Sequence, residues 1–290
     1  MKQVKLLIAC LLALCVVLPG VAVADTLDDI LERGTLRVGM EPGYMPFEMT
    51  NKKGEIIGFD VDMAKRIAKA MGVELELVST AWDGIIPALI TKKFDIIMSG
   101  MTLTQERNLK ISFADPYIVI GQSILVDKKL AGEIKSYKDL NDKKYKVASK
   151  LGTTGEQAVK RVIPKATYIS FETEQEGVMD LLNGKVDAFV YDLPFNAIAF
   201  AEKGQGKVVL LDDPFTYEPL AWAVNRGNAD FLNWLNNFLV QVKNDGTYAP
   251  PGAYSLRVSA DRGDGSGCRR RSGRRRPRGP GCGRRRRAGP

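Results

Sequence analysis

Histidine is absent from all 290 residues of this chain, and no cysteine occurs between residues 16 and 267. The lack of histidine excludes Ser-His-Asp and Cys-His catalytic arrangements and removes the commonest metal ligand. The lack of cysteine excludes disulfides and thiolate chemistry from that stretch. Any catalysis would therefore depend on carboxylate, lysine or tyrosine side chains, and we predict neither a metal site nor a cofactor.

The first 24 residues have the pattern of a secretory signal peptide. A basic start is followed by an apolar run over residues 6–18 and by Ala22-Val23-Ala24 at the end. The run is too short to span a bilayer, and a small-residue motif of this kind marks a cleavage site. A buried N-terminal helix would not account for the basic start. We therefore predict removal of residues 1–24 and secretion to the periplasm.

The last 42 residues differ sharply in composition from the rest of the chain. Residues 249–290 hold 13 Arg and no Lys, whereas residues 1–248 hold 23 Lys and six Arg. Few apolar side chains accompany the arginines, so we predict that this tail is disordered. It carries a net charge of +11, against −3 for residues 1–248. It is either an arm for nucleic acid or membranes or, as we prefer, a frameshift or cloning artefact. We expect no nucleic-acid binding by the folded core.

Strands and helices alternate twice along the region between these ends. The first series is predicted to have strands near residues 36–40, 73–78 and 96–98, with helices at 59–71 and 82–90. The second has strands at 146–149, 167–170 and 187–191, with helices at 154–162 and 173–182. Such alternation indicates parallel sheets. We predict an α/β fold of two lobes, each a mostly parallel sheet flanked by helices.

Two extended segments, residues 115–123 and 213–222, lie between the two series and are predicted to pair as crossover hinge strands. Lobe 1 would then comprise residues 25–118 and 219–248, and lobe 2 residues 119–218. The amphipathic helix predicted over residues 229–244 would return to lobe 1. Ligands in open α/β sheets bind at the carboxyl ends of the strands, and both series lead to polar residues there.

Short motifs of aromatic, acidic, glycine and threonine residues mark the loops and strand ends. In chain order they are Leu36-Arg37-Val38-Gly39, Tyr44-Met45-Pro46-Phe47-Glu48, Gly58-Phe59-Asp60-Val61-Asp62, Trp82-Asp83-Gly84-Ile85-Ile86-Pro87-Ala88-Leu89, Ser99-Gly100-Met101-Thr102-Leu103-Thr104-Gln105-Glu106-Arg107, Phe113-Ala114-Asp115-Pro116-Tyr117, Gly152-Thr153-Thr154-Gly155 and Asp187-Ala188-Phe189-Val190-Tyr191-Asp192. Over about residues 25–248 the chain resembles the periplasmic solute-binding proteins of polar amino-acid ABC transporters, bacterial extracellular family 3. The resemblance implies a type II periplasmic binding fold.

The resemblance also implies a function. Such a protein is a monomer that binds a free polar amino acid, closes about its hinge, and delivers the ligand to the membrane permease of an ABC importer without catalysing a reaction. Burying a zwitterion requires both of its charges to be paired, so contacts from both lobes are expected.

The carboxylate of the ligand is assigned to Arg107 and Thr102 by the resemblance. A guanidinium can grip a carboxylate with two parallel hydrogen bonds, and the preceding loop residues Ser99, Gly100 and Met101 are included in the predicted site. The alternative for Arg107 is a solvated surface side chain.

Asp192 follows an apolar strand and is predicted to accept the ligand's ammonium group, although it could also cap the next helix. Thr153 and Thr154 open a predicted helix, whose free N–H groups favour an anion. Simple helix capping is the alternative for both threonines.

Three aromatic residues, Tyr44, Phe47 and Trp82, could enclose the stem of the ligand, although each could instead belong to the core. Glu41 corresponds in the family to an acidic residue at the distal end of the ligand side chain. A carboxylate there would favour Arg, Lys, Gln or His and disfavour Glu or Asp, unless it is an exposed loop acid.

An enzyme on the same scaffold is the main alternative function. Some relatives resemble cyclohexadienyl dehydratase, and Glu41 or Asp192 could act there as acid or base. A sensor module or a cell-wall lyase subunit would need a further domain, for which the sequence offers no second folded region.

Overall fold

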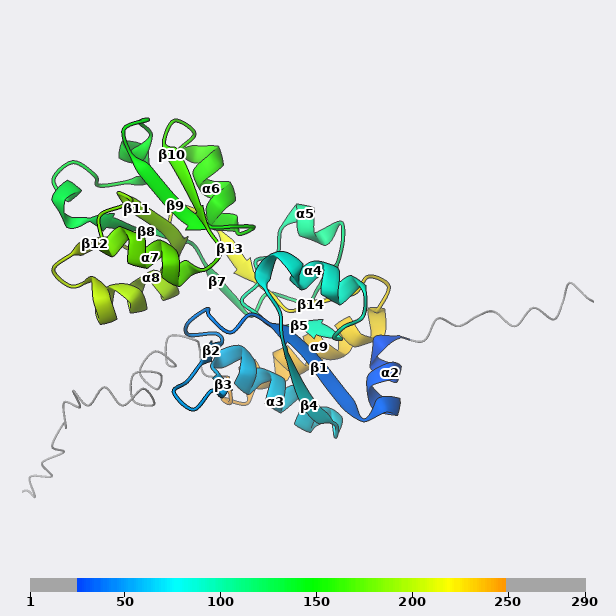
Figure 1. Ribbon diagram of the computed structural model, residues 1–290. Coiled ribbons are helices and arrows are strands. Elements are labelled where there is room, and N and C mark those ends of the chain that lie inside the picture. The colour runs from blue at the N-terminus through cyan, green and yellow to red at the C-terminus, as the bar shows by residue number, and fades with distance from the viewer. Residues whose placement is uncertain (1–24, 249–290) are drawn as a thin grey trace, which may run out of the picture.

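The structure, a computed structural model, describes residues 25–248. The predicted signal peptide and the predicted arginine-rich tail lie outside the described residues. Two lobes lie side by side, each built on a five-stranded sheet (Figure 1). The predicted two-lobed α/β fold is confirmed.

The sheet of the first lobe has the strand order β4-β1-β5-β14-β6. Its strands are β1 (Thr35–Met40), β4 (Glu74–Ser79), β5 (Ile96–Ile97), β6 (Ser112–Phe113) and β14 (Ala223–Val224). Strand β1 runs parallel to β4 and β5, whereas β14 is antiparallel to β5 and β6. A small hairpin of β2 (Met49–Thr50) and β3 (Ile56–Ile57) is attached to this lobe.

The sheet of the second lobe has the order β10-β9-β11-β8-β12. Its strands are β8 (Gln122–Asp127), β9 (Lys146–Lys150), β10 (Thr167–Phe171), β11 (Ala188–Asp192) and β12 (Val208–Leu211). Strand β9 is parallel to β10 and β11, and β8 is antiparallel to β11 and β12. Each sheet therefore has three parallel strands at one side, and the middle strand, β5 or β11, pairs on its other side with an antiparallel strand, β14 or β8.

Helices pack on both sheets, and their ends follow the sequence signals. In the first lobe they are α2 (Thr26–Arg33), α3 (Phe59–Met71), α4 (Trp82–Ile90), α5 (Gln105–Asn108) and α9 (Ala229–Asn244); in the second, α6 (Thr154–Val162), α7 (Glu174–Leu182) and α8 (Leu193–Ala199). Helix α2 ends at Gly34 in the left-handed conformation, which glycine adopts without steric cost. Helix α7 starts with a capping box between Thr173 and Glu176. Within residues 25–248, no helix has the length and apolar character needed to cross a membrane.

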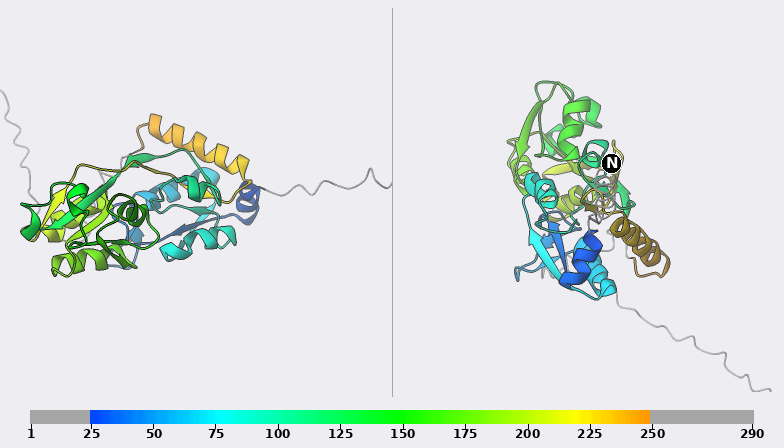
Figure 2. Two further views of the ribbon diagram at one scale, coloured as in Figure 1. Left: turned by 90° about the horizontal axis from the view of Figure 1, so that it is seen from above. Right: turned by 90° about the vertical axis from the view of Figure 1, so that its right-hand side faces the viewer.

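Two strands, β7 (Ile118–Ile120) and β13 (Glu218–Leu220), connect the lobes (Figure 1). They pair antiparallel, with Ile118 opposite Leu220. The predicted paired crossovers are confirmed, whereas the lobe boundaries themselves stay a prediction. After β13 the chain returns to the first lobe, where α9 lies along its outside (Figure 2).

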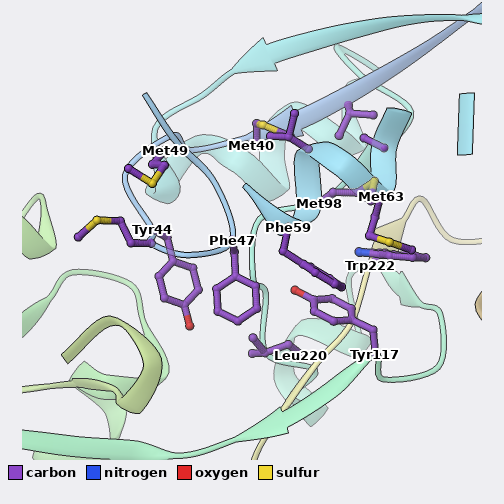
Figure 3. Packing of buried hydrophobic residues seen from close by; sticks show 14 of the residues in the cluster. Met40, Tyr44, Phe47, Met49, Phe59, Met63, Met98, Tyr117, Leu220 and Trp222 are labelled. Atoms are coloured by element: carbon purple, nitrogen blue, oxygen red, sulfur yellow. The ribbon is translucent and has the colours of Figure 1, made fainter. Parts of the chain in front are cut away.

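A row of aromatic rings fills the first lobe beneath the loops that face the second (Figure 3). The ring centroids of Phe59 and Tyr117 are 5.3 Å apart, and those of Tyr117 and Trp222 are 5.5 Å apart. The buried carboxylate of Asp60 accepts hydrogen bonds from the Tyr117 hydroxyl, from the Trp222 indole and from the backbone N–H of Gly100. Burial raises the pKa of Asp60 to about 6. This carboxylate therefore fixes the loop at Gly100 to the aromatic core.

Candidate functional site

A cavity lies between the lobes, where the strands of both sheets end. Its lining residues are Glu41, Tyr44, Glu48, Trp82, Ser99, Gly100, Thr102, Arg107, Gln122, Thr153, Thr154, Tyr191 and Asp192. Strand β1 ends just before Glu41, and β11 ends at Asp192. The site is therefore at the carboxyl ends of the strands, where open α/β sheets bind ligands. It includes every predicted site residue except Phe47 and Met101.

Arg107 is buried in this cavity, with 8% of its surface exposed. Thr104 caps the short helix α5 by accepting a hydrogen bond from the backbone N–H of Arg107. The guanidinium donates to the carbonyl oxygens of Thr102 (2.9 Å) and Gly152 (3.3 Å). Burial lowers its pKa. Arg107 is thus not a solvated surface side chain, and since a guanidinium has five N–H donors, it keeps donors for a carboxylate.

Asp192 faces the cavity from the second lobe. Its carboxylate accepts hydrogen bonds from the Tyr44 hydroxyl and from the Gln122 side-chain amide. Asp192 occupies the N-cap position of helix α8, but its side chain makes no capping hydrogen bond to that helix. Burial raises the pKa of Asp192 to about 7, although the bonds from Tyr44 and Gln122 and the charge of Arg107 oppose this rise.

The loop before helix α6 forms part of the cavity wall on the second lobe. Thr153 caps that helix by accepting from the backbone N–H of Glu156, and its hydroxyl donates to the carbonyl of Lys150 (2.7 Å). The hydroxyl oxygens of Thr154 and Thr102 lie 3.4 Å apart across the lobes. Thr153 and Thr154 both line the cavity and also form the start of helix α6. Ligand binding and helix capping are therefore compatible interpretations of these two residues.

Aromatic side chains close two sides of the cavity. The Trp82 indole N–H donates to the carbonyl of Gly152 (3.0 Å), and the Arg107 guanidinium lies 5.3 Å from the Trp82 ring centroid. The ring of Tyr44 packs on Gly100, where a Cβ atom would approach Tyr44 Cε1 to 2.2 Å. Gly100 also has φ = 54°. Only glycine combines this backbone conformation with such a close approach.

Two predicted site residues lie in the core instead. Phe47 is fully buried next to Tyr44, with ring centroids 4.8 Å apart (Figure 3). The side chain of Met101 belongs to an apolar cluster with Ile85, Leu89 and Phe94. The structure therefore does not bring Phe47 or Met101 to the cavity. Phe47 packs against the ring of Tyr44, and Met101 anchors the loop that carries Thr102.

Sequence reasoning missed three lining residues, Glu48, Gln122 and Tyr191. Glu48 ends a motif already recognised, and its carboxyl accepts from the Ser99 hydroxyl (2.7 Å), which in turn accepts from the backbone N–H of Glu41. Gln122 is a polar residue at the start of strand β8, before its apolar residues 124–126 and next to a hinge. That position resembles the position of Asp192 at the end of its strand, and it could have identified Gln122.

Glu41 meets a partner that was also missed. Its carboxylate accepts from Lys150 Nζ, and the same ammonium donates to Glu174 (2.8 Å). Lys150 ends β9, directly before the loop of Thr153 and Thr154. Burial raises the pKa of Glu41, and the charge of Lys150 opposes this rise. Glu41 is half-buried and paired, rather than an exposed loop acid.

The lobes are closed on each other at this site. Tyr44 reaches Asp192, Glu41 reaches Lys150, and Trp82 reaches Gly152, each from the first lobe to the second. These contacts are hydrogen bonds or ion pairs of the kind that a zwitterion would make. Among residues 25–248, no group of three or more Asp or Glu side chains is arranged so that it could hold a metal ion.

Comparisons with known proteins agree with this geometry. The model of the bacterial extracellular solute-binding proteins, family 3, matches residues 36–250. The L-cystine-binding protein TcyJ of Escherichia coli K12 is 32% identical over 221 residues, which are 76% of this chain and 82% of that protein.

Two solved structures share the fold and much of the sequence. One, described as a binding component of an ABC transporter from Wolinella succinogenes complexed with lysine, is 55% identical, with a TM-score of 0.72 and coverage of 78% of this chain and 94% of that chain. The other is the ancestral amino acid-binding protein AncCDT-1, described as a precursor of cyclohexadienyl dehydratase. It is 48% identical, with a TM-score of 0.72 and coverage of 81% and 98%.

Proposed function

Because this chain belongs to family 3 of the bacterial extracellular solute-binding proteins, we propose that it binds one free amino acid as a zwitterion between its lobes and delivers it to an ABC importer. One observation carries the proposal. The cation of Arg107, from the first lobe, and the carboxylate of Asp192, from the second, line the same buried cavity. A fixed cation and a fixed anion at one site match the two charges shared by every free amino acid.

In this proposal Arg107 binds the ligand carboxylate with two parallel hydrogen bonds. Thr102, Thr153 and Thr154 add hydroxyl and backbone donors, and the start of helix α6 contributes its positive dipole end. Asp192 accepts the ligand ammonium in place of the Tyr44 hydroxyl. The rings of Tyr44 and Trp82 cover the stem of the ligand and exclude water from these ion pairs.

Hinge closure follows from the distribution of these groups. Desolvating a charge is unfavourable unless it is paired, and the two ligand charges find their partners on different lobes. The ligand would therefore dock on one lobe, and the other would close over it by rotation about β7 and β13. The permease would recognise this closed form. We place the mature protein in the periplasm as a monomer.

The side-chain end of the ligand would face Glu41. A carboxylate there favours a positively charged or hydrogen-bond-donating side chain, as in Arg, Lys, Gln or His, and disfavours Asp and Glu. The lysine in the Wolinella succinogenes structure supports this class of ligand.

Calorimetry against the free amino acids, combined with solution X-ray scattering, tests the proposal. We expect heat of binding and compaction with at least one of Arg, Lys, Gln or His. The variant Arg107→Gln should bind at least about tenfold more weakly, because bonds to a charged group are each worth about 1.5–3 kcal/mol. Arg161→Gln, at an exposed arginine of the second lobe, is the control. Absence of heat and of compaction with every amino acid would refute the proposal.

A dehydratase is the second candidate, and the pKa of Asp192, raised to about 7 by burial, favours it. A carboxyl group that exchanges a proton near neutral pH is suited to general acid catalysis. Incubation with cyclic carboxylic acids followed by product analysis distinguishes the candidates. Turnover that disappears in Asp192→Asn would identify an enzyme, and unchanged substrates would leave binding as the function.

A further inference from the structure

Three charged side chains, Glu41, Lys150 and Glu174, form a triad beside the cavity. Lys150 Nζ donates to Glu41 from one side and to Glu174 (2.8 Å) from the other. The side chains of Lys150 and Glu174 are each 1% exposed, whereas that of Glu41 is 18% exposed. Glu41 lines the cavity, while Lys150 and Glu174 do not. Lys150 therefore stands where it can act on a ligand through Glu41.

The triad combines two carboxylates with one ammonium, which leaves one net negative charge. Burial lowers the pKa of Lys150, but Glu174 and Glu41 raise it by more, so the ammonium stays charged. Burial, followed by the charge of Asp60, raises the pKa of the nearby Glu48 well above its usual value, which disfavours a further negative charge there. The end of the cavity at Glu41 thus presents a single excess negative charge.

One carboxylate oxygen of Glu174 accepts no hydrogen bond within residues 25–248. Among the described residues its Oε1 atom is buried without a hydrogen-bond partner. Glu174 is also the first residue of helix α7, so its position is fixed by the fold. The single ammonium of Lys150 therefore neutralises only one of the two carboxylates in the triad.

We propose that Lys150 is a specificity-determining residue, an internal counter-ion that reduces the charge facing the ligand side chain from two negative charges to one. This inference rests on the proposed function and deepens it. A positively charged side chain at Glu41 is attracted by both carboxylates and repelled by the Lys150 ammonium. A neutral side chain of the same shape feels neither force strongly. Lys150 thus lowers the preference for cationic ligands without contacting them.

The ratio of two dissociation constants, Kd, measures this effect. Arginine is compared with citrulline, or lysine with norleucine, according to which basic amino acid the wild type binds. Each pair shares the backbone zwitterion and most of its shape but differs by one charge. A change in stability or closure affects both members alike, so it cancels in the ratio of the neutral Kd to the basic Kd.

We expect this ratio to rise at least about tenfold in Lys150→Met, which corresponds to about 1.4 kcal/mol, because the two carboxylates then act on the ligand charge without the opposing ammonium. Glu174→Gln, which leaves no net charge, should lower the ratio below that of the wild type. The double variant Lys150→Met/Glu174→Gln restores one net negative charge and should return the ratio to near the wild-type value. Because it removes both fully buried charges together and leaves only Glu41, which faces the cavity, it also keeps the test decisive if Lys150→Met does not fold.

Lys160→Met is the matched control. The Lys160 side chain is 60% exposed and pairs with Glu156 four residues earlier in helix α6. The substitution therefore removes one positive charge from the same lobe, but outside the cavity. Its ratio should not change. Equal ratios in the wild type, Lys150→Met and Glu174→Gln would overturn the inference, as would a wild type that binds only neutral amino acids. A wild type that binds no amino acid at all would instead refute the proposed function.

Discussion

The Tyr44 hydroxyl of the first lobe donates a hydrogen bond to the Asp192 carboxylate of the second lobe, 148 residues further along the chain. The same carboxylate is the proposed acceptor of the ligand ammonium. Ligand binding and lobe closure thus share an acceptor, and the protonation state of Asp192 affects both.

Ligand affinity should fall as the pH falls below about 7. Burial raises the pKa of Asp192 to about 7, and an ammonium ion requires the ionised carboxylate, so below this pH a proton must leave on binding. The expected limit is about a tenfold loss of affinity per pH unit. Calorimetry from about pH 8 to about pH 5 measures it. Asp192→Asn should bind weakly with little pH dependence. If affinity changed equally with pH in the wild type and in Asp192→Asn, the pH dependence would not originate at Asp192.

The stability of the ligand-free protein should show the opposite trend. A carboxyl group whose pKa is raised in the folded state favours folding while protonated, so its contribution is complete below about pH 4 and is lost as the pH rises through about 7. At about pH 8, Asp192→Asn should therefore be more stable than the wild type by on the order of 4 kcal/mol. Chemical unfolding at several pH values tests this. A variant that is less stable at every pH would refute it.

Gly100→Ala should weaken both stability and binding. The added Cβ would overlap Tyr44 Cε1 at 2.2 Å, and the backbone has φ = 54°. We expect a loss of roughly 2–4 kcal/mol, which includes overpacking as well as backbone strain. Gly54→Ala is the control, because Gly54 has φ = 81° with open space around it. It should cost only about 1 kcal/mol and leave affinity unchanged. Equal losses in the two variants would exclude the role of Tyr44 packing.

Trp82→Phe should speed the release of ligand. It keeps an aromatic wall but removes the indole N–H that bonds to Gly152 across the closed lobes. One hydrogen bond contributes about 0.5–1.5 kcal/mol, so we expect a roughly fivefold increase in the dissociation rate with a nearly unchanged association rate. Stopped-flow measurements separate the two rates, with Trp234→Phe on α9 as the control. A slower association alone would contradict the bridging role.

The succession of elements could be predicted from the sequence because its signals are local. Periodic apolar residues located both series of strands and helices. The hinge strands were recognisable as extended segments between the series, and their pairing is confirmed. Motifs likewise identified the loops that surround the cavity.

The orientation of side chains within those loops could not be predicted. Phe47 lies three residues from Tyr44 in one motif, yet only Tyr44 reaches the cavity. Long-range pairs were equally hidden. Lys150 meets Glu41 across 109 residues of sequence, and only the closing of two sheets brings them together. Asp192 had two local interpretations, and in the structure it stands at the N-cap position of α8 without a side-chain capping hydrogen bond while it also lines the cavity.

The placement of Trp82 also provides an optical signal. Of the three tryptophans in the chain, Trp222 is fully buried in the first lobe and Trp234 lies on helix α9, whereas Trp82 alone bonds to the opposite lobe. Separating the lobes would expose this one indole to water and leave the other two in place. Intrinsic fluorescence should therefore follow opening and closing in real time, without any attached dye.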